Sequence, residues 1–346
     1  MDTAWSTFHG NNARTGYRST PGPRQQPTVD WEFEVAPGLR SSPAVADETI
    51  YIGGIDDRIY AVDATDGIEQ WRFQTDSWVY SSPAVADDTI YIGSHDENVY
   101  ALDASDGTEE WRFQTRSWVE SSPAVVDGTV YVGSHDYHLY AVDATTGTEQ
   151  WRFRTDEEVV SSPAVQGQTV YIGSRDGHCY AINAADGTER WQAQTAGRVY
   201  GSPAVAAGMV WVAGEDCLHA FDADTGEECW RYEAAGGISA TPAVDSSTVY
   251  ISCFGAENGY VYAIDRDAGT ELWRIQTGDS IHSSAAIADD ILYFGCLDGS
   301  IYALSTDDGT IQWRYDAEGE VASSPAVVDG TMYIGDSDTL YRFTDP

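Results

Sequence analysis

The sequence contains no lysine, so its 18 basic residues are all arginines, against 56 acidic residues and a formal net charge of −38. A chain this poor in cations has no basic patch with which to replace the counterions of a nucleic acid or an anionic membrane, and neither is expected as a partner. The acidic residues occur in every part of the chain rather than in one tail. This distribution indicates adaptation to molar salt, in which the Debye length falls to about 3 Å and self-repulsion is screened.

Long apolar runs are also lacking, and we expect a soluble chain without membrane insertion. Residues Met1 to Trp5 do not show the charged and then apolar pattern of a secretory signal. Two alternatives stay open: the chain is cytoplasmic, or it follows a removed leader and works outside the cytoplasm. The second is favoured, in a high-salt environment. We expect a monomer.

Cysteine is scarce. The five cysteines are an odd number, none is adjacent to another and none forms a C-x-x-C pair: Cys179, Cys217, Cys229, Cys253 and Cys296. This pattern argues against a disulfide framework and against a zinc site. We expect all five to be small buried residues.

The chain does contain a repeat of about 40 residues. One tryptophan marks each copy, at spacings of 40, 40, 40, 40, 39, 43 and 40 residues: Trp31, Trp71, Trp111, Trp151, Trp191, Trp230, Trp273 and Trp313. A second series follows the motif Ser-Ser-Pro-Ala-Val, from Pro43 to Pro325, with Ala285 in one proline position. Each series has eight members, and both show the same two irregularities in spacing. The sequence therefore indicates eight copies of the repeat.

The sequence pattern within each copy predicts four short strands. Residues 121–155 contain four alternating or apolar runs separated by turns rich in aspartate and glycine. One such sheet cannot bury both of its faces, so we predict an all-β fold, an eight-bladed β-propeller of four-stranded antiparallel blades. A β-solenoid is the competing fold, but its repeats are shorter, and a proline at the start of the first strand suits an edge beside a central channel.

The tryptophan and proline series are offset at the two ends of the chain. Trp31 precedes the first Ser-Ser-Pro motif, and no tryptophan follows the last motif at Pro325. The eighth blade therefore lacks its outer strand, which we expect the strand around Trp31 to supply by pairing with the C-terminal blade. We divide the chain into a prelude, residues 1–27, packed on a propeller domain, residues 28–346.

Before each repeat tryptophan from Trp71 onward the sequence reads Ala-x-Asp-x-x-x-Gly-x-x-x-Trp, with small variations. This pattern resembles the tryptophan-docking motif of pyrroloquinoline quinone (PQQ)-like propellers, which include quinoprotein alcohol dehydrogenases and a non-catalytic lipoprotein of outer-membrane assembly. The stretch Trp5 to Asn11, followed by Thr15 and Gly16, resembles the prelude of the same family, where it serves packing. The resemblance makes the repeat tryptophans and glycines structural; the glycines are Gly67, Gly107, Gly147, Gly187, Gly226, Gly269 and Gly309.

A recurring aspartate follows the second strand of seven copies: Asp56, Asp96, Asp136, Asp176, Asp216, Asp298 and Asp338. Seven copies favour an Asx-type turn over seven metal sites. His95 and His135 occupy equivalent positions in neighbouring copies, but the pattern supplies no third ligand, and we expect no metal.

In such a blade the loops between blades share one face, the loop face, with the turns that join the second and third strands. Residues that break the repeat on this face are the candidate binding residues. The position before each Ser-Ser pair varies around the ring and predicts the rim of a funnel, with candidate binding residues Arg40, Tyr80, Glu120, Tyr200 and His282. Trp78 and Trp118 lie beside this rim, where other copies have Glu, Gly or Ser, and indicate a contact surface. An equally favoured alternative is that these two tryptophans only pack against a neighbouring blade. An insertion of three residues near Phe254 to Gly259 adds Phe254 to the candidates.

Three functions are compatible with this pattern. A non-catalytic scaffold or binding module for a protein or peptide on the loop face is favoured. A propeller that senses a sugar or another small ligand is the alternative, because aromatic faces suit sugar rings. A PQQ-dependent dehydrogenase with calcium is disfavoured: the family's enzymes are longer and carry vicinal cysteines, and few cations here could receive the carboxylates of the cofactor. No catalytic residue, no cofactor and no enzymatic activity is therefore assigned.

Overall fold

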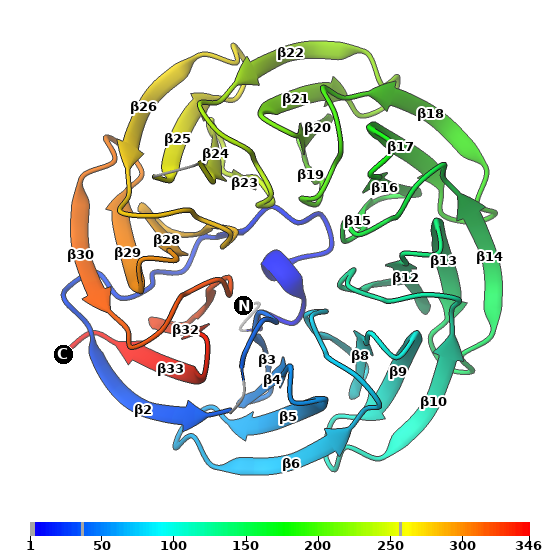
Figure 1. Ribbon diagram of the computed structural model, residues 1–346, viewed down its shortest axis with the longest axis horizontal. Coiled ribbons are helices and arrows are strands. Elements are labelled where there is room, and N and C mark those ends of the chain that lie inside the picture. The colour runs from blue at the N-terminus through cyan, green and yellow to red at the C-terminus, as the bar shows by residue number, and fades with distance from the viewer. Residues whose placement is uncertain (1–3, 36–37, 256–257) are drawn as a thin grey trace.

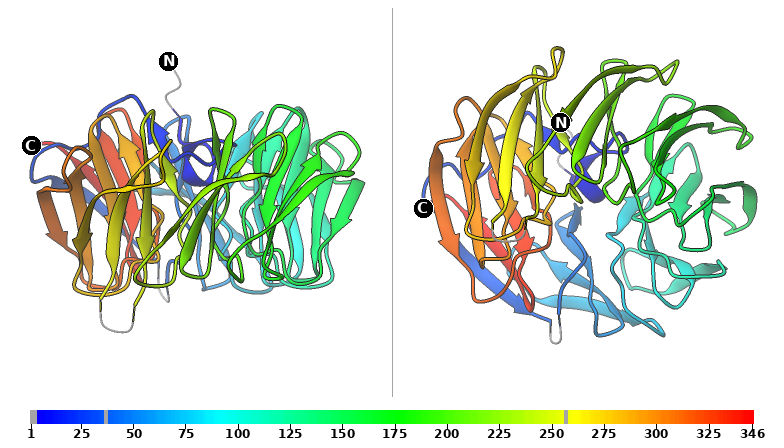
Figure 2. Two further views of the ribbon diagram at one scale, coloured as in Figure 1. Left: turned by 90° about the horizontal axis from the view of Figure 1, so that it is seen from above. Right: turned by 45° about the horizontal axis from the view of Figure 1, so that its top comes forward.

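The computed structural model describes residues 4–35, 38–255 and 258–346, and these form eight sheets arranged around a central axis (Figure 1). In six sheets the strand order follows the chain from the centre outward; in the other two, β1 adds inside β27 and β2 adds outside β33. The predicted all-β, eight-bladed propeller is confirmed. Seen from the side, the ring is a disc about one strand deep (Figure 2).

The first four blades contain these strands: β3 (Ala44–Ala46), β4 (Thr49–Gly53), β5 (Arg58–Asp63) and β6 (Glu69–Gln74) in blade 1; β7 (Ala84–Ala86), β8 (Thr89–Gly93), β9 (Asn98–Asp103) and β10 (Glu109–Gln114) in blade 2; β11 (Ala124–Val126), β12 (Thr129–Gly133), β13 (His138–Asp143) and β14 (Glu149–Arg154) in blade 3; β15 (Ala164–Gln166), β16 (Thr169–Gly173), β17 (His178–Asn183) and β18 (Glu189–Gln194) in blade 4.

The other four blades contain these strands: β19 (Ala204–Ala206), β20 (Met209–Gly214), β21 (Cys217–Asp222) and β22 (Glu228–Glu233) in blade 5; β23 (Ala243–Val244), β24 (Thr248–Cys253), β25 (Tyr260–Asp265) and β26 (Glu271–Gln276) in blade 6; β27 (Ala286–Ala288), β28 (Ile291–Gly295), β29 (Ser300–Ser305) and β30 (Ile311–Asp316) in blade 7; β31 (Ala326–Val328), β32 (Thr331–Gly335), β33 (Thr339–Thr344) and β2 (Thr28–Glu34) in blade 8. The prelude adds β1 (Tyr17–Arg18) and the 3₁₀ helix η1 (Phe8–Gly10).

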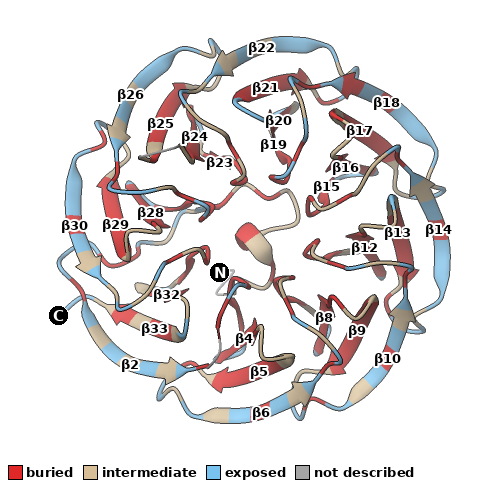
Figure 3. Cartoon of the chain, in the orientation of Figure 1, coloured by how far each residue is buried: buried red, intermediate tan, exposed pale blue. Residues whose placement is uncertain are grey.

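Burial changes from the middle of each blade to its outer edge. The second and third strands, such as β12 and β13, are buried almost throughout because neighbouring blades cover both of their faces (Figure 3). The outer strand β14 alternates, with Trp151 buried and Arg152 exposed. No helix in the described ranges is long and apolar enough to span a membrane.

The closing strand lies where the sequence predicted it. β2 pairs antiparallel with β33, in a register that runs from Thr28 opposite Thr344 to Glu34 opposite Thr339. Strands from the two ends of the chain thus complete blade 8, and the open seam between the last blade and the first disappears.

The prelude passes around the inside of the ring and hydrogen-bonds to the inner strand of one blade after another (Figure 1). Its backbone partners in the inner strands, in order, are Val45, Val85, Val165, Val205, Val244 and Ile287, bonded to Trp5, Ser6, Asn12, Ala13, Thr15 and Gly16. In blade 8, Gly330 in the turn between β31 and β32 donates to Pro21 O. The Asn12 side chain also donates to Val125 O at 2.9 Å. Because β1 adds to β27, blade 7 has five strands instead of the predicted four. The prelude therefore satisfies backbone groups that would otherwise face an empty channel.

Arg14 anchors the prelude at the centre of the ring. Its side chain is fully buried, and its guanidinium nitrogens donate to five acceptors: Thr7 Oγ1, Phe8 O, Ser122 O, Pro123 O and Pro163 O. Burial lowers the pKa of Arg14 to about 9. Carbonyl oxygens from two neighbouring blades thus hold this cation without a carboxylate partner.

Each repeat glycine faces the tryptophan of the preceding blade. A Cβ atom placed on Gly107, which has φ +73°, would lie 2.5 Å from the Trp71 ring. The Trp71 indole also donates its Nε1 hydrogen to Ala104 O at 2.9 Å. Blade 8 has no such glycine loop, and there the prelude takes its place, because Trp313 Nε1 donates to Pro23 O at 2.8 Å.

We expect Gly107→Ala to destabilise the ring more than Gly128→Ala does. Both glycines have φ +73°, so both substitutions carry the left-handed backbone strain of about 1 to 2 kcal/mol. No atom lies within 4 Å of a Cβ on Gly128, whereas the Cβ on Gly107 overlaps the indole. The overlap adds about 1 to 3 kcal/mol, measurable as the difference between the two free energies of unfolding in urea. Equal losses would show that the indole contact is not tight.

Two sequence expectations need correction. Cys229 is exposed, because it lies on the solvent side of the outer strand β22, whereas the other four cysteines are buried as expected. The Asx turn is confirmed at Asp96, whose carboxylate accepts from Asn98 N at 3.0 Å, and recurs at Asp136, Asp176 and Asp298. In blade 8 the prediction of Asp338 is wrong: Asp336 accepts from the amides of Asp338 and Thr339, two residues earlier in a shorter turn.

Candidate binding face

One face of the disc carries both the loops between blades and the turns between the second and third strands. His95 in such a turn donates its backbone N–H to Trp78 O in an inter-blade loop, at 2.9 Å. Blades 3 and 4 repeat the contact, with His135 N to Trp118 O and Arg175 N to Glu158 O. We call this side the loop face.

The predicted rim residues surround one cavity of about 180 Å³ at the centre of the loop face. The structure brings together all eight positions before the Ser-Ser pairs: Arg40, Tyr80, Glu120, Val160, Tyr200, Ser239, His282 and Ala322. Phe8 of η1 also lines this funnel. The position of the prelude inside the channel does not follow from the sequence.

Eight hydroxyl groups form a closed ring around the funnel wall. In each blade the backbone N–H of the second residue of the Ser-Ser pair, or its equivalent, donates to the hydroxyl oxygen of the same residue in the next blade, at 2.8 to 3.2 Å. We call these residues the hydroxyl ring: Ser42, Ser82, Ser122, Ser162, Ser202, Thr241, Ser284 and Ser324. The last bond, from Ser324 to Ser42, closes the ring across the seam.

Glu120 is held by two histidines of the loop face. Its carboxylate oxygens lie 3.0 Å from His95 Nε2 and 3.1 Å from His135 Nε2. Burial alone would raise the pKa of Glu120, but the close contacts with His135 and His95 outweigh burial and lower the pKa to about 2. Glu120 is therefore a carboxylate at neutral pH. Within the described ranges no group of three or more His, Cys, Asp or Glu side chains is arranged to hold a metal ion.

The same histidine packs between aromatic rings. His95 stacks on Trp118, with ring centroids 4.7 Å apart and planes 2° from parallel, and on Tyr80, with centroids 4.8 Å apart. Trp78 lies 6.0 Å from the His95 ring. The side chains of Trp78 and Trp118 nevertheless stay 49% and 50% exposed. The sequence analysis treated packing and exposure of these two tryptophans as alternatives. In the structure each tryptophan ring both contacts His95 and stays half exposed.

The remaining candidates lie around the other side of the ring. Phe254 stacks on His282 at 5.4 Å, and His282 Nδ1 lies 3.0 Å from Ser239 Oγ. Residues 256–257 of the predicted insertion lie outside the described residues. Tyr200 is exposed beneath the Arg175 guanidinium, which lies 5.0 Å from its ring centroid. Arg40 is exposed at the rim.

Sequence reasoning missed two features of this face. Tyr137 is exposed in the turn between β12 and β13, so it lies on the loop face with Trp78, Trp118 and Tyr200. The positions equivalent to Tyr137 hold Asp57, Glu97 and Gly177, and this change along the repeat was the available signal. His95 and His135, considered only as metal ligands, instead hold Glu120.

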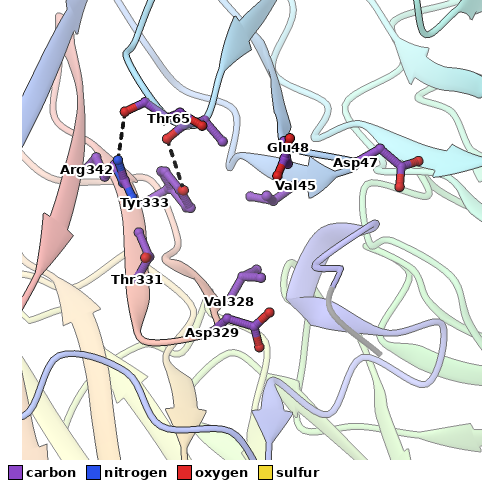
Figure 4. A pocket seen from close by; sticks show the side chains of 10 residues that line it. Val45, Asp47, Glu48, Thr65, Val328, Asp329, Thr331, Tyr333 and Arg342 are labelled. Carbon is purple, nitrogen blue, oxygen red and sulfur yellow. Dashed lines mark hydrogen bonds between the residues drawn. The ribbon is translucent and has the colours of Figure 1, made fainter. Parts of the chain in front are cut away.

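A cavity of about 640 Å³ lies on the opposite face at the seam between blades 8 and 1 (Figure 4). Its lining includes Thr331, Tyr333 and Arg342, and Arg342 donates to Thr65 O across the seam at 2.8 Å. Cavities with equivalent lining lie between blades 2 and 3 and between blades 3 and 4. This groove is therefore an enlarged copy of a feature of the repeat.

The repeat, the fold and the family comparison define the class of protein. The chain is a PQQ-like propeller, and the family model described as outer membrane protein assembly factor BamB matches residues 25–123, 117–208, 176–253 and 257–345. The chain belongs to this family. A search of curated proteins finds no match.

Solved structures share the fold at low sequence identity. BamB from Moraxella catarrhalis is 17% identical, with a TM-score of 0.79, over 92% of this chain and 99% of that one. Quinohemoprotein alcohol dehydrogenase from Comamonas testosteroni is 16% identical, with a TM-score of 0.86, over 99% of this chain and 80% of that one. The computationally designed Ika8 protein is 18% identical, with a TM-score of 0.80, over 90% and 98%. These neighbours include both an assembly factor and an enzyme.

Proposed function

We propose that this propeller is a non-catalytic binding module, adapted to high salt, whose loop face receives a protein or peptide partner. The observation that carries the proposal is the pair Trp78 and Trp118, each half exposed on adjacent inter-blade loops. Tryptophan is among the residues that dominate the binding energy of protein interfaces.

The aromatic pair is organised before any partner arrives. His95 packs flat against Trp118, and Glu120 holds His95 from the side. Side chains that are already ordered lose little conformational entropy on binding, which leaves more of the contact energy for affinity. Tyr137 and Tyr200 extend the exposed aromatic surface on the same face.

The funnel does not suit the tricarboxylate cofactor of the quinoprotein relatives. Of the residues that line it, Arg40 alone carries a permanent positive charge, and the Glu120 carboxylate adds a negative one. Burial, and then the charge of Arg40, lower the pKa of His282, so its imidazole is neutral at pH 7. A cofactor with three carboxylates would meet one cation, and this argument supports the non-catalytic proposal.

We expect Trp78→Ala and Trp118→Ala each to weaken partner binding by at least about 2 kcal/mol, which is about 25-fold or more. The measurement is a quantitative pull-down in molar salt from the native cell, followed by titration of the captured protein against each variant. Ile311→Ala, at an exposed apolar side chain on the outer strand β30, is the matched control and should bind normally.

Two results would contradict the proposal. One is capture that is the same for both tryptophan variants and for the unaltered chain. The other is an absorbance spectrum that shows stoichiometric quinone after addition of calcium and PQQ, together with dye-linked alcohol oxidation.

A further inference from the structure

The hydroxyl ring has hydrogen-bonding capacity that the protein does not use. Each of its eight oxygens accepts one backbone N–H from the neighbouring blade, as in Ser122 N to Ser162 Oγ at 2.9 Å. In the described part of the chain, none of these hydroxyls donates its own proton to a protein acceptor within hydrogen-bonding distance. All eight side chains lie in residues at least nine-tenths buried, and all line the funnel. Eight donors and eight free lone pairs thus face one small space.

The funnel has the volume to hold one six-membered ring, and an aromatic side chain lines it. Its volume of about 180 Å³ exceeds the roughly 150 Å³ in which a buried cavity of another protein holds a benzene molecule. Phe8 contributes an aromatic side chain to its lining, positioned by the Arg14 guanidinium 5.5 Å from the ring centroid. An aromatic face can pack against the C–H face of a saturated ring.

The charged groups that line the funnel lie at its rim: Arg40 is exposed there, and Glu120 is held by two histidines. The five hydrogen bonds that the Arg14 guanidinium donates all go to protein oxygens, so this cation is engaged within the protein. The Glu120 carboxylate faces His95 and His135. The hydroxyl ring itself is uncharged, and its hydroxyls can both donate and accept, so it matches a neutral ligand whose own groups also donate and accept.

We propose that the hydroxyl ring and Phe8 form a binding site for a neutral polyhydroxyl compound of single-ring size, such as a monosaccharide or a cyclitol. The ligand lies on Phe8 and exchanges hydrogen bonds with the serine hydroxyls. Because similar hydroxyls surround it on every side, the site discriminates weakly between sugars that differ in the orientation of one hydroxyl. This site is separate from the tryptophan surface.

The test is isothermal titration of the full chain in molar potassium chloride with D-glucose, D-galactose and myo-inositol. Sodium sulfate and tetramethylammonium chloride serve as anionic and cationic comparators. We expect saturable binding of the neutral compounds, with similar affinities for the two sugars, and no binding of either ion.

Ser162→Ala and Ser161→Ala form a matched pair for this test. Each removes one buried hydroxyl from the start of blade 4, but only Ser162 lines the funnel. We expect Ser162→Ala to weaken binding about five- to tenfold, the effect of one hydrogen bond, and Ser161→Ala to leave it unchanged. If Ser162→Ala does not fold, Phe8→Leu replaces it, since that variant keeps an apolar side chain and removes the aromatic face. It should weaken binding by a comparable factor.

The proposal is overturned if none of the three neutral compounds binds at millimolar concentration, if sulfate binds more tightly than they do, or if the Ser162→Ala or Phe8→Leu variant binds as the unaltered chain does. Trp78→Ala should leave binding of the sugars unchanged. Failure of this proposal and failure of the partner-binding proposal are therefore distinguishable.

Discussion

A chain that lacks residues 1–36 will show no cooperative unfolding transition. The deletion removes β2, and with it the strand that pairs with β33 and the Trp31 indole that packs against Gly67 and donates to Ala64 O. Removing a core tryptophan side chain costs about 3 to 5 kcal/mol, and a whole domain is stable by only about 5 to 15 kcal/mol. Trp31 is partly buried, but the deletion removes it together with every other contact of β2. The same deletion removes Arg14 and the other backbone partners of the inner strands. Circular dichroism during heating, in molar salt, measures the transition.

A second variant, the rescue chain, separates the contribution of the closing strand β2 from that of the prelude. It lacks residues 1–36 but carries residues 28–36 after Pro346, behind a copy of turn residues 103–108. In this chain the outer strand follows β33 through the same kind of turn that joins β9 to β10. We expect a cooperative transition to return at a lower midpoint, because the prelude is still missing. A normal melt of the simple deletion would refute the closure by β2.

At low ionic strength the unaltered chain will lose its cooperative unfolding transition. Its 18 arginines cannot neutralise 56 acidic residues. The ion pairs that form are mostly exposed and local, as in Arg72 with Glu69 and Arg112 with Glu109, and such pairs contribute about 0 to 1 kcal/mol each. The acidic residues repel one another over a Debye length of about 30 Å at 0.01 M salt but only about 3 Å at 1 M.

The measurement is a series of thermal melts in potassium chloride between these two concentrations. A matched series in sucrose, which is excluded from the protein surface but screens no charge, is the control. Screening predicts that potassium chloride restores the transition and that sucrose does so only weakly. A melting temperature that does not depend on salt would contradict the proposed adaptation.

The regular part of the fold could be read from the sequence because each copy of the repeat carries the same local signals. Alternating residues specify strands, Asp and Gly specify turns, and the spacing of the tryptophans specifies the number of blades. The offset of Trp31 against Pro325 even located the closing strand, because a missing element at one end matched a surplus element at the other. The rim positions, including Arg40 and His282, followed from the same register.

The parts that the sequence could not specify depend on contacts between residues far apart in the chain. The sequence of residues 5–23 does not predict that Arg14 donates to the carbonyl oxygens of Pro123 and Pro163. Nor does it predict that the Trp313 indole donates to Pro23 O. Cys229 and Cys179 both lie in strands, and only the packed ring decides that one is exposed and the other buried.

The sequence by itself thus determined the ring, its eight blades and its closure, since these follow from a local pattern that is repeated. Only the tertiary structure decided that the prelude enters the channel beneath the rim, with Phe8 lining the funnel, that Glu120 binds two histidines, and that eight separate hydroxyls meet in one ring. The physical reason is that closing the ring brings equivalent positions into hydrogen-bonding distance, 39 to 43 residues apart between successive blades and 282 apart across the seam. What then lies between these positions depends on a segment outside the repeat.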